Sequence, residues 1–278
     1  MQDTYPHIGG WSKVHIALAS LAAAWEQKEP NLERCRTLCA QAAALGAELV
    51  AFPEMTLTGF TMAAAAAAEA PTDSWTIRSF ADCARAAGVA VAFGVVLRTS
   101  ARPVNCLVLV DSTGAERARY AKIHPFSHAA EDAHYDSGGA LAAAPVAGMT
   151  LGFSVCYDLR FPELYTALAP ACAALLVIAN WPAARIAHWD ALLTARAIEC
   201  QCYMIGVNRT GVDGNGIGYP RSSRVIDPRG AVLQPEVVAD ELDLYTLDAA
   251  HVAAYRRAFP TLRDRRPDTY REFRTPVV

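Results

Sequence analysis

The chain has 278 residues, of which 53% are hydrophobic and 19% are charged, and its formal net charge is −3. This composition provides enough apolar surface for a large core and excludes an intrinsically disordered chain. The small negative charge argues against a nucleic-acid-binding surface, which requires clustered lysine and arginine side chains.

The first half of the chain alternates between β-rich runs and segments in which apolar residues have helical spacing. The spacing predicts a helix over residues 31–45, which ends before Gly46, and a second helix that Thr72 and Asp73 can cap and that runs to Ala87. The strands predicted in this half cover residues 14–20, 48–52, 89–97 and 104–111.

The second half continues this alternation. Its predicted strands cover residues 149–155, 174–179, 203–208, 223–226 and 242–247, and its predicted helices cover residues 162–169, 188–201 and 248–258. This order of elements predicts an α/β fold in which helices cover buried sheets. Because we find no linker, we expect one domain over residues 1–278, with a core over about residues 13–260 and a C-terminal tail over residues 261–278.

Two absences bear on where the protein acts. No apolar run reaches the roughly 18 residues that a membrane span requires, and the N-terminus lacks the charge and cleavage pattern of a leader sequence. We therefore expect a cytoplasmic protein with no membrane partner. Five arginines near the C-terminus are mixed with aspartates, which predicts a solvated or intersubunit face. They are Arg256, Arg257, Arg263, Arg265 and Arg266.

The chain has eight cysteines, most of which lie within apolar helix or strand patterns. In a large cytosolic protein this pattern predicts reduced thiols in the core. Examples are Cys35, Cys39, Cys83, Cys106 and Cys172. Closely spaced cysteines can form half of a zinc site, but no second pair of ligands follows them, so we expect no bound metal.

Three reactive residues directly follow apolar runs that end in loops: Glu54, Lys122 and Cys156. In α/β folds such positions are held by the rigid sheet and remain open to a ligand. A strand, a sharp turn and a helix starting near Pro162 would place the sulfur of Cys156 near backbone N–H groups, which favours the thiolate. A lysine beside a thiol can stabilise an oxyanion, and a glutamate can move the thiol proton.

Each of these residues also has a structural interpretation. Cys156 could be another core thiol, Glu54 a helix cap and Lys122 a solvated side chain. The polar segment that follows Cys156, residues 157–163, argues instead for a cleft or an ion-pair network at this strand end. A cysteine protease would need one of three histidines, His124, His134 or His188, and nothing in the sequence selects one. The glycines of residues 211–218 lack the strand-to-helix context of a dinucleotide site.

Three ordered motifs resemble the signatures of the nitrilase (carbon–nitrogen hydrolase) superfamily. They are Phe-Pro-Glu-Met at residues 52–55, Tyr-Ala-Lys-Ile-His at residues 120–124 and Val-Cys-Tyr-Asp-Leu-Arg-Phe-Pro-Glu at residues 155–163. Further segments are similar to the omega-amidase branch, namely residues 180–182, 188–189, 192–199, 213–216 and 255–260. The likeness extends from the first strand to about Phe259.

The resemblance implies a four-layer α-β-β-α sandwich with two mixed β-sheets, usually a homodimer, with no cofactor. It also implies a catalytic triad of Glu54, Lys122 and Cys156, and a second glutamate that orients the lysine. Glu131 fits that role, with Asp132 as the alternative if the alignment is shifted by one residue.

The resemblance further implies hydrolysis of a small omega-amide, of the 2-oxoglutaramate or 2-oxosuccinamate type, through a thioester on Cys156. Candidate pocket residues are Tyr157, Trp181, Arg160 and Arg185. Either arginine could bind a substrate carboxylate, although Asp158 or Glu163 is the expected partner of Arg160. Trp189 is expected in the core.

Two departures from the family pattern, residues 221–223 and Pro125, leave the width of the pocket open. The alternatives are therefore a sibling hydrolase, such as a deaminated-glutathione amidase or a nitrilase, and a non-catalytic interaction protein with the same fold.

Overall fold

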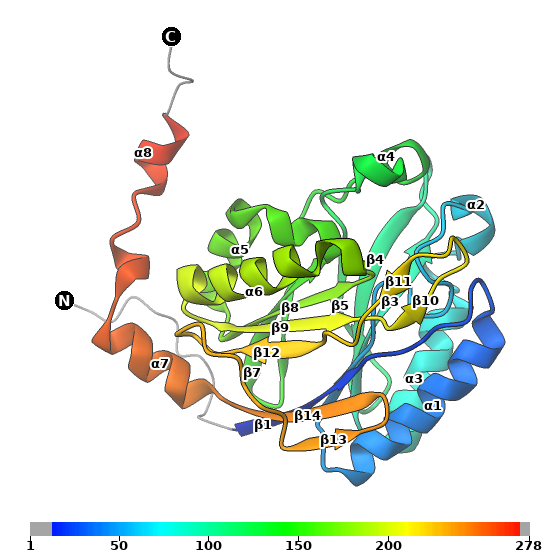
Figure 1. Ribbon diagram of the computed structural model, residues 1–278, viewed down its shortest axis with the longest axis horizontal. Coiled ribbons are helices and arrows are strands. Elements are labelled where there is room, and N and C mark those ends of the chain that lie inside the picture. The colour runs from blue at the N-terminus through cyan, green and yellow to red at the C-terminus, as the bar shows by residue number, and fades with distance from the viewer. Residues whose placement is uncertain (1–12, 273–278) are drawn as a thin grey trace.

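The computed structural model describes residues 13–272 and shows two mixed β-sheets packed face to face, with helices on their outer sides (Figure 1). This arrangement is the α/β four-layer sandwich that the resemblance implied, and the prediction is confirmed. Residues 1–12, where we expected no leader sequence, and residues 273–278 of the predicted tail lie outside the described residues. Within the described range, no helix is long and apolar enough to cross a membrane.

The larger sheet has seven strands in the order β13-β14-β1-β2-β3-β4-β5. They are β1 (Lys13–Ala19), β2 (Leu49–Ala51), β3 (Ala90–Leu97), β4 (Val104–Val110), β5 (Glu116–Ala121), β13 (Val237–Ala239) and β14 (Leu242–Asp248). Strands β1, β2 and β3 are parallel, and the remaining neighbours are antiparallel. Because β5 is two antiparallel steps from β3, it runs in the same direction as β2, so both strands end at the same edge of the sheet.

The smaller sheet has five strands in the order β12-β9-β8-β7-β6. They are β6 (Ala143–Val146), β7 (Met149–Val155), β8 (Ala174–Ala179), β9 (Tyr203–Asn208) and β12 (Arg224–Ile226). The three central strands, β7, β8 and β9, are parallel. A separate two-stranded hairpin consists of β10 (Gly211–Val212) and β11 (Gly218–Tyr219).

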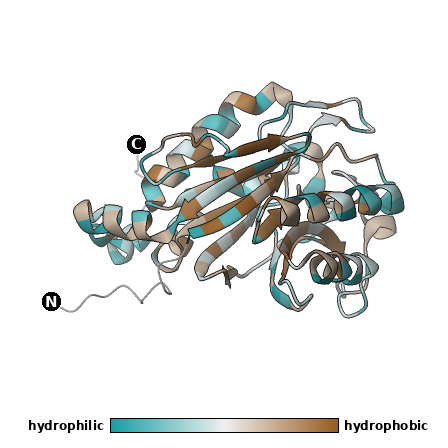
Figure 2. Cartoon of the chain, turned by 90° about the horizontal axis from the view of Figure 1, so that it is seen from below, coloured by the Kyte–Doolittle hydropathy of each residue, from teal (hydrophilic) through white to brown (hydrophobic). Residues whose placement is uncertain are grey.

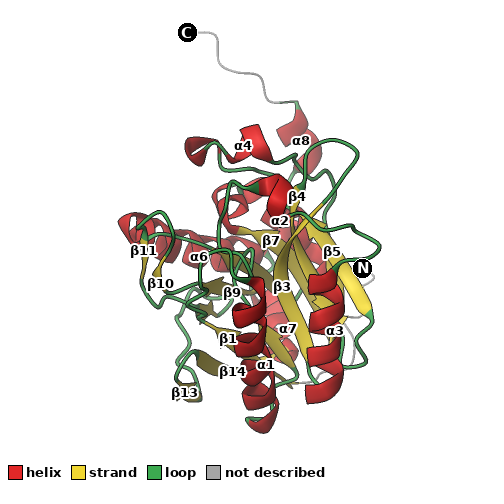
Figure 3. Ribbon diagram, turned by 90° about the vertical axis from the view of Figure 1, so that its right-hand side faces the viewer, coloured by secondary structure: helices red, strands yellow, loops and turns green. Residues whose placement is uncertain are grey.

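Helices α1 (Lys28–Ala44) and α3 (Trp75–Ala87) lie side by side on the larger sheet (Figure 3). Helices α5 (Pro162–Leu168) and α6 (Ile186–Cys200) cover the smaller sheet. The remaining helices are α2 (Ala64–Ala67), α4 (Glu131–His134), α7 (Ala249–Ala258) and α8 (Pro267–Arg271), and α8 projects away from the sheets (Figure 1). Short 3₁₀ turns include η2 (Cys156–Arg160) and η4 (Ala183–Arg185).

The hydrophobic core is divided between the layers by the two-residue period of the strands. On β1, Ile16 and Leu18 pack in the cluster that lies between the sheets, whereas Ala17 and Ala19 pack against α1 and α3. In Figure 2 hydrophobic residues are concentrated on the strands, and the helices carry many of the hydrophilic residues. Both faces of the larger sheet are therefore covered.

Several details differ from the sequence-based predictions. The cap of α3 is Ser74, whose hydroxyl accepts a hydrogen bond from the N–H of Ile77, so the assignment to Thr72 and Asp73 was wrong. Strands β6, β10, β11 and β13 were not predicted because they have only two to four residues each, too few for an alternation pattern. Strand β5 was not predicted either, because its six residues include two arginines and a glutamate.

The prediction of a solvated or intersubunit arginine face is wrong for Arg256, which is only 3% exposed within its own chain. Its guanidinium donates to the carbonyl oxygens of Ala169, Cys172 and Cys200 at 2.9 to 3.1 Å. Because a guanidinium can donate to several carbonyl groups at once, these contacts hold α7 against the end of α6 and against the segment between α5 and β8. The expected burial of thiols is found for seven of the eight cysteines, and Cys156 is partly exposed.

Candidate active site

Glu54 and Lys122 meet at the edge of the larger sheet where β2 and β5 end. The Nζ of Lys122 lies 2.9 Å from Oε1 of Glu54 and 2.7 Å from Oε2 of Glu131. All three side chains are at most 1% exposed. The sequence pattern placed both residues after apolar runs, and the structure brings them into contact.

Glu131 is the first residue of α4, and its Oε2 also accepts a hydrogen bond from the N–H of Phe126 at 2.6 Å. Asp132, which we held as the alternative, is exposed, and its carbonyl oxygen accepts a hydrogen bond from Arg102. The structure therefore places Glu131, and not Asp132, beside the lysine.

The charge state of Lys122 follows from its surroundings. Burial alone would lower the pKa of this ammonium, but the carboxylates of Glu54 and Glu131 outweigh burial and raise the pKa above its usual value. Lys122 is therefore a fixed cation. An ammonium has three N–H donors, and within the described part of the chain two of them bond to the glutamates.

Asn105 completes a ring of side chains that sequence analysis missed. Its Nδ2 donates to Oε1 of Glu54 at 2.7 Å and to Oε1 of Glu131 at 3.0 Å. Asn105 is 1% exposed and lies near the start of β4. A lone amide residue in an otherwise apolar strand was the available signal, because a buried polar side chain requires a partner.

Cys156 follows β7 of the smaller sheet and is the first residue of η2. Its φ angle of +45° is uncommon for a residue with a side chain, and such strain concentrates at functional sites. The Sγ lies 4.0 Å from the carbonyl oxygen of Asn180. The N–H of Asn180 donates to Oε2 of Glu54 at 3.0 Å, so one residue contacts both the thiol and the carboxylate.

The environment of Cys156 does not favour the thiolate, contrary to the prediction from its turn. Burial raises the pKa of this thiol well above its usual value, and the carboxylates of Glu54 and Glu131 raise it further, while Lys122 acts in the opposite direction. The resting group is therefore a thiol, which must lose its proton to a base before it can act as a nucleophile.

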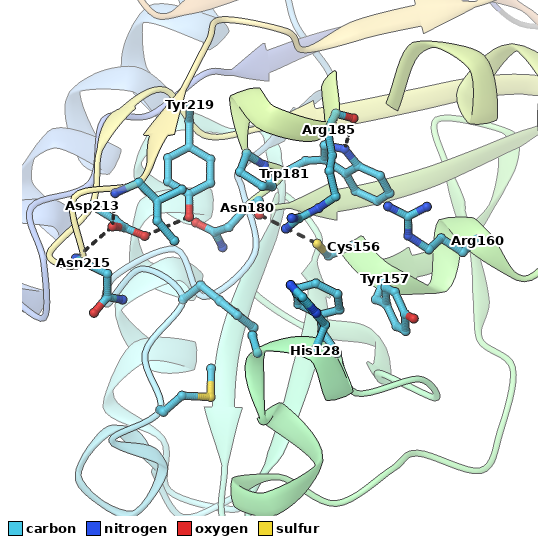
Figure 4. Close-up of a pocket in the computed structure, with 16 residues that line it drawn as sticks. His128, Cys156, Tyr157, Arg160, Asn180, Trp181, Arg185, Asp213, Asn215 and Tyr219 are labelled. Atoms are coloured by element: carbon cyan, nitrogen blue, oxygen red, sulfur yellow. Dashed lines mark hydrogen bonds between the residues drawn. The ribbon is translucent and has the colours of Figure 1, made fainter. Parts of the chain in front are cut away.

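A pocket of about 330 Å³ opens over Cys156 (Figure 4). The four predicted binding residues, Tyr157, Arg160, Trp181 and Arg185, all line it. Aromatic side chains that sequence analysis did not select also form its walls, namely Phe60, Phe126 and Tyr219. Such apolar walls with a few polar groups are typical of small-molecule sites.

Arg160 is not bonded to Asp158 or Glu163, so the expected pairing was wrong. Its guanidinium lies 4.8 Å from the ring centre of Trp181, and Nη2 is 3.4 Å from Nδ1 of His188. The guanidinium of Arg185 lies 5.2 Å from the ring centre of Phe126. Among the described residues neither arginine forms an ion pair with a carboxylate, and both extend over the pocket beside Cys156 (Figure 4).

Trp181 and Trp189 have different positions. Trp189 is fully buried and its Nε1 donates to the carbonyl oxygen of Ser222 at 2.9 Å, as expected for a core residue. Trp181 is 2% exposed, yet it lines the pocket, and its Nε1 donates to the carbonyl oxygen of Arg185 at 2.8 Å. Trp181 therefore fixes the backbone that carries Arg185.

The histidines do not form the pairing of a cysteine protease. The Nδ1 of His124 lies 2.7 Å from Oδ1 of Asp158, His134 is exposed on α4, and His188 contacts Arg160. Within residues 13–272 no histidine ring is hydrogen-bonded to Cys156. Among the described residues, the charged groups that shift the pKa of the thiol are Glu54, Lys122 and Glu131.

Comparison with known proteins decides the family. The family model for carbon-nitrogen hydrolases matches residues 15–257. The chain belongs to the carbon–nitrogen hydrolase family. The omega-amidase YafV of Escherichia coli (strain K12) is 40% identical over 225 residues, which cover 79% of this chain and 84% of that protein.

Two further carbon–nitrogen hydrolases extend the likeness. The deaminated glutathione amidase of Homo sapiens is 31% identical over 90% of this chain and 82% of its own length. The crystal structure of XC1258 from Xanthomonas campestris, a CN-hydrolase superfamily protein with an arsenic adduct in the active site, has a TM-score of 0.85 at 32% identity and covers 95% of this chain and all of that one. This carbon–nitrogen hydrolase is thus an amidase, and the non-catalytic alternative is set aside.

Proposed function

We propose that this amidase hydrolyses the amide of a small dicarboxylic acid monoamide, of the 2-oxoglutaramate or 2-oxosuccinamate type, to the acid and ammonia. The observation that carries the proposal is the position of Cys156. Its thiol lies at a pocket that holds two arginines without carboxylate partners among the described residues, next to the buried group of Glu54, Lys122 and Glu131. An amide at one end of the substrate and a carboxylate at the other fit these two features.

In the first half of the reaction, Glu54 takes the proton of the Cys156 thiol as the sulfur attacks the amide carbon. The carbonyl oxygen becomes an oxyanion, which the third N–H of Lys122 and the backbone N–H of Tyr157 stabilise. The protonated Glu54 then gives its proton to the amide nitrogen, the carbon–nitrogen bond breaks and ammonia leaves. The acyl group remains on Cys156 as a thioester.

In the second half, Glu54 takes a proton from water as the water oxygen attacks the thioester carbon. The carbon–sulfur bond breaks, the acid leaves, and the proton on Glu54 returns to the sulfur of Cys156. Glu54 can serve as base in both halves because Asn105 and Asn180 hold its two carboxylate oxygens in place. Glu131 acts through Lys122, whose ammonium it orients.

Arg160 and Arg185 account for the acidic end of the substrate. A guanidinium binds a carboxylate through two parallel hydrogen bonds, and stacking on Trp181 or Phe126 restricts its motion. The presence of two arginines supports a second candidate function, in which the substrate carries two carboxylates. Deaminated glutathione is such a substrate. The relative that acts on deaminated glutathione shares 31% identity with this chain.

The experiment that tests the proposal measures kcat/KM for three substrates. Ammonia release is followed for 2-oxoglutaramate and for an uncharged amide of equal length, and release of the amine product, cysteinylglycine, is followed for deaminated glutathione. We expect 2-oxoglutaramate to exceed the uncharged amide by about 10- to 100-fold, the effect of one hydrogen bond to a charged group. Equal values for the charged and the uncharged amide would contradict the proposal. Higher values for deaminated glutathione would select the second candidate.

A further inference from the structure

The two halves of the active site belong to different sheets. Lys122 follows β5 of the larger sheet, and Cys156 follows β7 of the smaller one. The distance between the ammonium and the thiol therefore depends on how the two sheet edges are held together. In packed proteins a misplacement of about 1 Å can cost 100-fold in rate.

Asp158 lies where these two edges meet. Its Oδ2 accepts hydrogen bonds from the hydroxyl of Tyr120 at 2.8 Å and from the N–H of Val155 at 3.0 Å. Its Oδ1 accepts from the backbone N–H of His124 at 3.0 Å and lies 2.7 Å from Nδ1 of the same residue. Asp158 is fully buried.

Three of these four contacts are hydrogen bonds that the carboxyl oxygens of Asp158 accept, from one hydroxyl and two backbone N–H groups. Tyr120 and His124 flank Lys122 at two residues on either side, and Val155 directly precedes Cys156. The ring of His124 also stacks on Phe161, with ring centres 3.7 Å apart. One carboxylate thus binds the side chain of Tyr120 before the lysine, the backbone of His124 after it and the backbone of the residue that precedes the nucleophile.

We propose that Asp158 is a positioning residue that holds the thiol of Cys156 in register with Lys122 and Glu54 by joining the ends of β5 and β7. This inference rests on the proposed function for the identity of the reaction. It does not require Asp158 to contact the substrate, because Asp158 does not line the pocket.

The first variant is Asp158→Asn, which retains the shape of the side chain. An amide nitrogen at either position faces a backbone N–H, that of Val155 or that of His124, so one edge must shift. We expect kcat for 2-oxoglutaramate to fall about 100-fold while KM changes by less than about threefold. A residue that only stabilises the fold would lower the melting temperature and leave the activity per folded molecule unchanged.

The second test uses a matched pair of buried tyrosines and remains decisive if Asp158→Asn does not fold. Tyr120→Phe removes the hydrogen bond that the hydroxyl donates to Asp158 and the longer one, of 3.3 Å, that it accepts from the N–H of Ile123. Tyr165→Phe removes the contact between Tyr165 and Ser154, whose oxygens are 2.7 Å apart. We expect kcat to fall about tenfold in Tyr120→Phe, as for a hydrogen bond to a charged group, and less than about twofold in Tyr165→Phe. Equal effects of the two substitutions would overturn the proposal.

Alkylation of Cys156 by iodoacetamide, followed by peptide mass spectrometry, gives a readout that needs no amide substrate. We expect the rate per folded molecule to fall about tenfold in Tyr120→Phe and to stay unchanged in Tyr165→Phe, because a displaced base assists the thiol less. If no tested amide is hydrolysed but this difference appears, the proposed function fails and the role of Asp158 stands. If the amide is hydrolysed and the two variants behave alike, the proposed function stands and the role of Asp158 fails.

Discussion

The ammonium of Lys122 lies 2.9 Å from Oε1 of Glu54, and both side chains are buried, with at most 1% of their surface exposed. A second carboxylate, that of Glu131, binds the same ammonium, so the buried group carries one net negative charge when all three are ionised. Breaking such a group by removing one member leaves an unpaired buried charge, which is costly. The group is therefore both a stability element and the proposed source of base and oxyanion contact.

Replacing Lys122 by methionine tests this double role. The substitution leaves two carboxylates without their common cation, so we expect the free energy of unfolding to fall by about 3 kcal/mol and ammonia release per folded molecule to fall at least about 1000-fold. Urea unfolding and a steady-state assay measure the two effects. The control is Lys28→Met, which removes a partly exposed pair with Glu69 and should leave ammonia release unchanged. More than a tenth of the wild-type rate in Lys122→Met would contradict the role of the lysine.

Substitution of Asn105 distinguishes a role in positioning the base, Glu54, from a role in stabilising the fold. Asn105→Ala removes the donor shared by Glu54 and Glu131, and we expect kcat to fall about 10- to 100-fold. The matched control is Asn31→Ala, because Asn31 is also a buried asparagine, with hydrogen bonds to backbone groups of Ala24 and Leu57. Both variants should lose stability, but only Asn105→Ala should lose turnover once folded. A similar loss of turnover in both would argue against a specific role.

The two pocket arginines should act on substrate affinity. We expect Arg160→Met or Arg185→Met to raise KM for 2-oxoglutaramate about 10- to 100-fold, as for a lost hydrogen bond to a charged group. KM for an uncharged amide should change little. Arg229, whose guanidinium lies 5.2 Å from the ring centre of Tyr255 away from the pocket, provides the control Arg229→Met. If neither pocket variant raises KM for the acid amide, another group binds the carboxylate.

Stability should decrease in alkaline solution because several thiols are buried. Burial raises the pKa of Cys106 and of Cys172 from 9.0 to about 12. Above pH 9 the unfolded chain loses these protons and the folded chain keeps them, so the unfolded state is favoured as the pH rises toward 12. Each thiol contributes up to about 1.4 kcal/mol per pH unit in this window.

Urea unfolding between pH 8 and pH 11 measures this slope. Cys106→Ala should reduce the slope of the free energy of unfolding against pH by the contribution of one thiol. Below pH 8 the difference in free energy of unfolding between this variant and the wild type should not depend on pH. A slope identical to that of the wild type would show that Cys106 ionises alike in both states.

The sequence predicted the strands that precede Glu54 and Cys156, because β2 and β7 lie within apolar runs. It did not predict β5, which precedes Lys122, because two arginines and a glutamate interrupt its apolar pattern. It placed Glu54, Lys122 and Cys156 directly after apolar runs, and the motif resemblance predicted Glu131. Contacts made by single polar residues within apolar strands could not be predicted, because no periodicity reveals the partner of Asn105. The partner of Arg160 was misassigned to neighbours in the sequence, whereas the structure places it against Trp181 from another strand end.

The pKa of Cys156 shows the same limit. The turn after β7 suggested a thiolate, yet the balance of burial, two carboxylates and one ammonium depends on side chains from four separate segments. Local sequence does not determine that balance. The packing of both sheets must be known first.

The most direct test of the account is ammonia release from 2-oxoglutaramate by the wild type, Cys156→Ala and Cys106→Ala side by side, with intact-protein mass spectrometry of quenched samples. We expect turnover by the wild type and by Cys106→Ala, no turnover by Cys156→Ala, and an acyl adduct on Cys156 in the active proteins. Full turnover by Cys156→Ala would contradict the proposed thioester mechanism.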